Sequence, residues 1–127
     1  MSENIVEIRD GLNDSERAEL TKHLVEKLQE LHNLTNDTPL VRARLQLDVA
    51  ELLVALERKP EAWTLAREAF DAALKEDAWQ DAVEACNVLF QCEQDDSVAA
   101  LGMGVWLAVS FPVDPELTLA MLVHIVD

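Results

Sequence analysis

Apolar residues recur at every third or fourth position along most of this 127-residue sequence, and no segment alternates apolar and polar residues at every second position. The first spacing places apolar side chains on one face of an α-helix, whereas the second is typical of a half-buried β-strand. Tyrosine, which is enriched in strands, is absent. The pattern therefore predicts an all-α chain.

Helix start signals divide this pattern into about six helices. Asn13 lies three residues before Glu16, as in a capping box. Thr38 and Asp77 precede later apolar segments as their expected N-caps. Either Asp95 or Asp96 should cap the segment after that. The expected helices cover about 14–33, 39–57, 60–75, 78–92, 97–110 and 115–127.

The length fits a single domain, since domains usually hold ~100–200 residues. We expect a flexible N-terminus at 1–12, a repeat-like core at 39–93, and two apolar helices at 97–110 and 115–127. The helix at 97–110 is apolar on nearly every side, which indicates a central helix or one that a partner covers.

The charge is strongly acidic, with 10 Lys and Arg against 25 Asp and Glu for a net charge of −15. All ten bases lie at or before Lys75, so the apolar final part of the chain carries acids alone. Such a chain repels phosphate groups, and we expect it to bind neither nucleic acid nor an anionic membrane.

Cysteine usage and the N-terminus favour a cytoplasmic protein. Residues 1–11 lack the basic and apolar regions of a secretory signal. Cys86 and Cys92 lie six positions apart in one expected helix, about 9 Å along its axis, which is too far for a disulfide. Residues 97–113 are uncharged, but Pro112 interrupts them and acids flank them, so a buried helix is expected rather than a membrane span.

One eight-residue pattern occurs twice. The segment AWTLAREA at 62–69 matches AWQDAVEA at 78–85 in the form A-W-x-x-A-x-E-A. Small alanine side chains on one face allow neighbouring helices to approach closely, and the tryptophan is expected to fill the groove at the turn. Antiparallel helix pairs of this kind stack into a solenoid or bundle.

Residues 40–93 resemble the tetratricopeptide repeat (TPR) family, whose unit is a helix pair of ~34 residues. The segment AELLVALERKPEAWTLAREAF at 50–70 is similar to the end of a first repeat helix, its turn and a second helix. Trp63, Ala66 and Ala73 match the aromatic and small positions of that family. The resemblance implies a TPR-like protein-interaction scaffold that holds peptides or partner helices.

No catalytic, metal or cofactor motif stands out, so we expect a non-enzymatic protein without cofactors. His23 and His32 point to opposite sides of their helix, and His124 fits a packed histidine better than a metal ligand. The Gly102-Met103-Gly104 segment lacks the third glycine of a dinucleotide loop, and close helix packing explains its glycines better.

Two candidate interaction sites remain. A polar stripe of Arg44, Asp48 and Glu51 is a hypothetical binding site for a basic or apolar segment of a protein partner. Within it, Arg44 and Asp48 can form an ion pair at i,i+4 spacing. The alternative is a self-assembling protein, a homodimer through its C-terminal helices. The residues expected at that interface are Trp106, Leu107, Met121 and Ile125.

Overall fold

The computed structural model describes residues 11–34 and 38–126, and every regular element in this part of the chain is an α-helix. The six helices run in the order α2 (Asp14–His32), α3 (Pro39–Ala55), α4 (Lys59–Lys75), α5 (Trp79–Gln91), α6 (Ser97–Ser110) and α7 (Pro115–Val126). The all-α prediction is confirmed, and each helix lies within a few residues of its expected bounds. Most of the expected flexible N-terminus, 1–10, lies outside the described residues, as does Asp127. Leu12 packs against the core.

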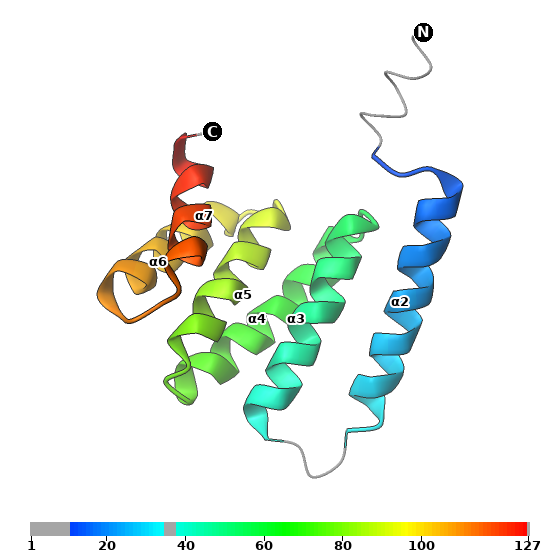
Figure 1. Cartoon of the computed structure of the whole chain (residues 1–127), viewed down its shortest axis with the longest axis horizontal. Coiled ribbons are helices and arrows are strands. Elements are labelled where there is room, and N and C mark those ends of the chain that lie inside the picture. The colour runs from blue at the N-terminus through cyan, green and yellow to red at the C-terminus, as the bar shows by residue number, and fades with distance from the viewer. Residues whose placement is uncertain (1–10, 35–37, 127) are drawn as a thin grey trace, which may run out of the picture.

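Each helix contacts neighbours that lie one or two places away in the chain, which is the arrangement of a stacked helical array. Helices α3, α5 and α7 lie side by side, with α2 beyond α3 at one end, while α4 lies behind α3 and α5 (Figure 1). Helix α6, which was expected to be central or covered by a partner, is not central: it lies near the other end of the array and packs against α5 and α7.

Local signals begin the first two helices as expected. The Asn13 side chain accepts a hydrogen bond from the backbone N–H of Glu16 at 2.8 Å, which caps α2. Its side-chain amide also donates to the Glu16 carboxylate at 2.7 Å, in place of the backbone N–H that donates in a capping box. Thr38 caps α3 by accepting a bond from the N–H of Val41 at 3.3 Å. Val41 itself is 42% exposed.

The residues expected to cap α5 and α6 form no side-chain hydrogen bond with the start of these helices. Ala78, rather than Asp77, precedes α5, and Asp96 precedes α6 without a side-chain hydrogen bond to it. Asp77 instead ends α4 with a left-handed backbone, φ 54°, and Glu57 and Glu93 do the same after α3 and α5. Acids in this conformation are uncommon, so the helix ends must be stabilised by their hydrogen bonds.

Those bonds form Schellman motifs. At the end of α3, the N–H of Glu57 donates to the carbonyl of Val54, and the N–H of Arg58 donates to the carbonyl of Leu53 at 2.8 Å. The same pair of bonds ends α4. At the end of α5, the Ser97 hydroxyl replaces the second bond, since it donates to the carbonyl of Leu89 and accepts from the N–H of Gln94.

In both copies of the repeated pattern, the tryptophan lies at the same distance in sequence from the left-handed residue that follows its helix. Trp63 lies fourteen residues before Asp77, and Trp79 lies fourteen residues before Glu93. Because α4 begins one turn earlier, Trp79 is the first residue of α5 while Trp63 lies inside α4. Of the six repeated alanines, Ala78 is partly buried and the other five are fully buried, so most of this face packs as expected: alanines 62, 66, 69, 82 and 85.

Candidate functional site

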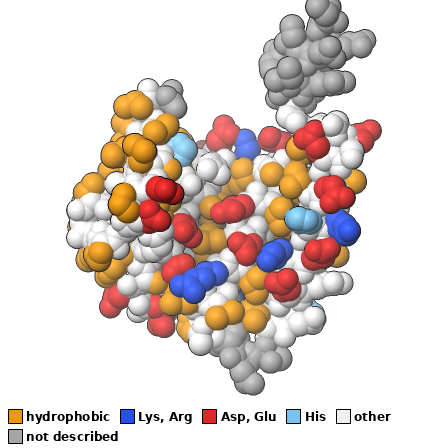
Figure 2. All heavy atoms as spheres, viewed as in Figure 1, with side chains coloured by type: hydrophobic (Ala, Val, Ile, Leu, Met, Phe, Trp, Pro, Cys, Tyr) orange, Lys and Arg blue, Asp and Glu red, His pale blue; other side chains and the backbone are white. Residues whose placement is uncertain are grey.

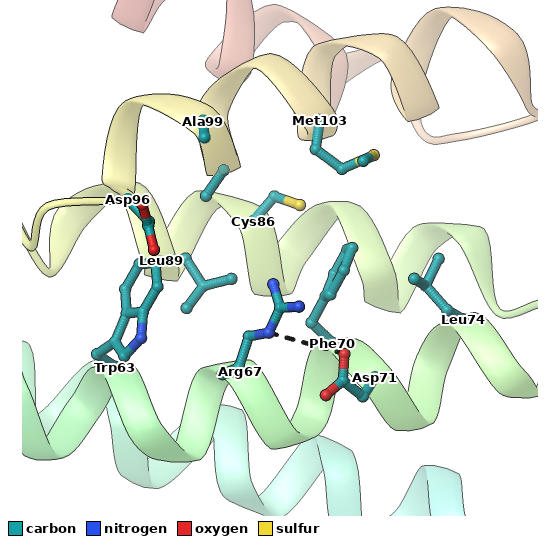
Figure 3. Close-up of a pocket in the computed structure, with 11 residues that line it drawn as sticks. Trp63, Arg67, Phe70, Asp71, Leu74, Cys86, Leu89, Asp96, Ala99 and Met103 are labelled. Atoms are coloured by element: carbon teal, nitrogen blue, oxygen red, sulfur yellow. Dashed lines mark ion pairs between the residues drawn. The ribbon is translucent and has the colours of Figure 1, made fainter.

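An open groove runs between α4 and α6, with α5 as its floor (Figure 3). Its wall on α4 is a stripe of residues spaced by four, three and four positions, which places them on one side of the helix: Trp63, Arg67, Phe70 and Leu74. The alanine face of α4 points into the core, so this stripe is left at the edge of α4 that faces the groove. We call this feature the α4–α6 groove.

Helices α5 and α6 complete the groove. Cys86 and Leu89 form its floor, and both are almost completely buried. Asp96, Ala99 and Met103 line the wall on α6. The cavity volume is about 600 Å³, within the usual range for ligand pockets.

The described backbones of α4 and α6 do not contact each other, because α5 separates them. The packing of α6 on α5 depends on Gly104. A Cβ atom built there would lie 2.7 Å from the Cβ of Cys86 and 2.4 Å from the Cε of Met121, so α6 and its neighbours pack together at a position where only glycine fits. The predicted role in close packing is confirmed for Gly104. It is wrong for Gly102, which meets no atom within 4 Å.

The groove has one basic side chain, and that side chain has partners. The Arg67 guanidinium lies 3.8 Å from the Asp71 carboxylate and 5.5 Å from the centre of the Phe70 ring. At the end of the groove, Figure 3 shows the Asp96 side chain directed toward the indole of Trp63. The groove therefore offers apolar surface along its length and an acid beside an aromatic ring at one end.

The Cys86 thiol on the floor is not a reactive nucleophile. Burial raises the pKa of Cys86 to about 12, although Arg67 opposes that shift, and burial raises the pKa of Cys92 to about 11. Nucleophilic attack requires the thiolate, which is scarce at neutral pH when the pKa is so high. Both cysteines are free thiols, as predicted from their spacing.

The polar stripe predicted to bind a partner lies where α3 meets α2 and α5, because its residues form ion pairs with both of these helices. Figure 2 shows acidic and basic side chains mixed over α3 and α5. Arg44 does not pair with Asp48, contrary to the prediction. Its Nε and Nη2 donate to the two carboxylate oxygens of Asp81 on α5, at 2.9 and 3.0 Å. Asp48 instead lies 3.7 Å from the Nζ of Lys27 on α2. These residues join neighbouring helices across the array.

Glu51 is the third residue of that stripe and is the least favourably placed acid in it. Partial burial raises the pKa of the Glu51 carboxyl, and the nearby charges of Asp48 and Glu84 raise it further. The structure thus brings the three predicted residues to one face but uses two of them as contacts between helices.

The predicted self-association residues divide into two pairs. Leu107 and Met121 are 1% and 0% exposed and belong to the core of this chain, so they are not available to a second copy. Trp106 and Ile125 are both 57% exposed. Figure 2 shows hydrophobic side chains gathered over α6 and α7. We call the exposed ones away from the groove the C-terminal apolar surface: Val98, Trp106, Val109, Leu119, Leu122, Val123, Ile125 and Val126.

His124 is a packed histidine, as predicted. Its Nε2 lies 2.7 Å from the Asn87 Oδ1, and its ring lies 4.8 Å from that of Phe90, so it joins α7 to α5. Within residues 11–34 and 38–126, no three His, Cys, Asp or Glu side chains form a cluster that could hold a metal ion. None of the described helices is both long and apolar enough to cross a membrane.

The sequence does not predict the α4–α6 groove, although the spacing of its α4 stripe is visible there. It marks Trp63 only as part of the repeat and Asp96 only as a helix cap. No protein-family model, no curated protein and no solved structure matches the chain.

Proposed function

We propose that this chain is a non-catalytic, TPR-like protein-interaction module, acting as an adaptor or chaperone, that binds a segment of another protein in the α4–α6 groove. The observation that supports this most is the groove itself, which leaves Trp63 half-buried and Met103 44% exposed beside an apolar floor. Large apolar side chains that remain open to water in a concave site favour occupation by apolar groups of a ligand.

The dimensions of the groove suit a polypeptide segment. Trp63 and Leu74 are eleven residues apart on α4, which corresponds to about 16 Å along the helix axis. That length accommodates about five residues of extended chain or three turns of helix. A basic or apolar segment fits a chain of net charge −15 better than an acidic one. Two buried free thiols favour the cytoplasm as the location.

Peptide display tests this proposal even though the partner is unidentified. A random peptide library is selected against the wild-type protein, against Ala99→Trp, which fills the groove, and against Ala55→Trp, a matched exposed alanine on α3 that lies outside it. We expect wild type and Ala55→Trp to enrich the same apolar peptides and Ala99→Trp to lose them. Enrichment that is equal for all three proteins, or absent with wild type, would contradict a binding role for the groove.

A second candidate function is self-association, which the C-terminal apolar surface favours. Helix α6 carries no charged residue, so a second acidic copy would meet little repulsion there. Light scattering at tens of micromolar should then give about twice the 14.2 kDa mass of the chain. Trp106→Lys and Leu119→Lys should restore the single-chain mass, whereas Val41→Lys on α3 should not. A single-chain mass for wild type would exclude this function.

A further inference from the structure

We propose that the segment bound in the α4–α6 groove carries a lysine or arginine at one end, and that this side chain stacks on Trp63 and pairs with Asp96. This inference rests on the proposed function, because it names the chemistry of the ligand for the same groove. Trp63 lies on α4 and Asp96 precedes α6, so they face each other from opposite walls.

The Asp96 carboxylate is available for such a contact. Although Asp96 occupies the N-cap position of α6, its side chain accepts no hydrogen bond from that helix. Within the described residues it also takes part in no ion pair, whereas the carboxylate of Asp71 at the other side of the groove already lies near Arg67. A basic group of the ligand would therefore find an unpaired carboxylate, that of Asp96, at the end of the groove that Trp63 lines.

Two kinds of interaction favour a base at this position. A cation over the face of an indole is bound more favourably than one over any other aromatic ring. A carboxylate beside that ring adds an ion pair. A ligand acid would instead approach both Asp96 and its neighbour Asp95, in a part of the chain where residues 76–127 hold ten acids and no base.

The geometry of the groove determines the position of the basic residue in the sequence of the ligand. Trp63 and Asp96 lie at one end of the groove, and Leu74 marks the other end of its α4 wall, about 16 Å away. The apolar residues of the ligand should therefore all lie on one side of its base, within about five residues of extended chain. A base in the middle of the apolar residues would meet the Arg67 guanidinium instead.

Three labelled peptides that share one apolar sequence from the display experiment, and differ only in an end residue of Arg, Gln or Glu, test this arrangement by fluorescence anisotropy. Wild type should bind the Arg peptide about five to ten times more tightly than the Gln peptide, and the Glu peptide most weakly. Asp96→Lys should reverse the order of the Arg and Glu peptides. Trp63→Leu should retain apolar binding but reduce the preference for Arg.

Each outcome is informative because Asp96 is exposed and the fold of its variants can be checked by thermal unfolding. Equal binding of all three peptides to wild type would contradict the basic-end inference while leaving the groove as a binding site. Unchanged preferences in a folded Asp96→Lys variant would do the same. Failure of every peptide to bind would contradict the proposed function as well.

Discussion

Arg44 and Asp81, 37 residues apart in the sequence, form a two-bonded ion pair that joins α3 to α5, and the Asp81 side chain is only 9% exposed. The pair also raises the pKa of the Arg44 guanidinium, mainly through the hydrogen bond to Asp81. A nearly buried carboxylate that loses its partner retains the cost of its removal from water. The contact therefore stabilises the array more than an exposed ion pair would.

Arg44→Ala should lower the free energy of unfolding by about 1–3 kcal/mol, because Asp81 loses both hydrogen bonds. Asp48→Ala, which removes an exposed contact with Lys27 on the same face, should change it by less than about 0.5 kcal/mol. Urea unfolding of both variants measures the difference. Equal losses would show that Arg44 and Asp81 are not specially coupled.

Glu51→Gln should stabilise the protein at pH 7 by a few tenths of a kcal/mol, about the size of other exposed charge interactions. The pKa of Glu51 is raised in the folded state, so its contribution to stability is lost as the pH rises through that pKa, and the ionised carboxylate is unfavourable at pH 7. Urea unfolding at pH 7 and pH 3 checks this, since the gain should disappear once Glu51 is protonated.

Glu61 provides the matched control for Glu51. Its pKa is lowered, mainly by the hydrogen bond from Arg58, so its ionised form is the favourable one. Glu61→Gln should therefore not stabilise the protein at pH 7. Stabilisation by Glu61→Gln and not by Glu51→Gln would contradict the assignment of these two acids.

Gly104→Ala should destabilise the protein by about 1–2 kcal/mol, although alanine is the better helix former, because the new methyl group overlaps Cys86 and Met121. Gly102→Ala, two residues away in the same helix, meets open space and should stabilise it by up to about 1 kcal/mol. Thermal unfolding of the two variants should move the midpoint in opposite directions. A shift of the same sign in both would contradict the close packing assigned to Gly104.

Alkaline pH should destabilise the protein through its buried thiols. The pKa of Cys86 rises from 9.0 to about 12 and that of Cys92 from 9.0 to about 11, so this contribution is complete below pH 9 and is lost between pH 9 and 12. The Cys86→Ala/Cys92→Ala variant should show a shallower fall in unfolding free energy over that range.

At pH 8, alkylation of the wild-type thiols by iodoacetamide should be slow until urea unfolds the protein. Fast alkylation of the folded protein would contradict the burial of the thiols.

The features that the sequence predicted are those that neighbouring residues determine. The Asn13 cap, with its bond to Glu16, and the Thr38 cap involve residues three positions apart, so their hydrogen bonds follow from local backbone geometry. The buried alanine faces of α4 and α5 follow from helical periodicity. The fold class and the approximate helix bounds could therefore be predicted from local sequence patterns.

The features that escaped prediction depend on such distant contacts. Arg44 had a plausible local partner in Asp48, and only the packing of α5 beside α3 shows that Asp81 takes that place. The left-handed acids Glu57 and Asp77 are an exception, because the hydrogen bonds at their helix ends are local. They escaped prediction because they carry no glycine signal.

The α4–α6 groove was hidden for a related reason. The apolar character of α6 did not indicate which side would be buried, and the close approach at Gly104 decides it. Only that packing sets Asp96 opposite Trp63.

The three tryptophan side chains allow the most direct test of the central claim, which is that the α4–α6 groove binds a partner segment. Trp63 lines the groove, Trp79 stacks on Phe111 at 3.9 Å, and Trp106 lies on the C-terminal apolar surface. Their indole N–H resonances in a ¹H–¹⁵N spectrum, assigned with single Trp→Phe variants, report on three different places. On titration with the Arg-ended peptide, the Trp63 resonance should shift and saturate while those of Trp79 and Trp106 stay in place. A shift of Trp106 with Trp63 unchanged, or no shift at all, would contradict binding in the groove.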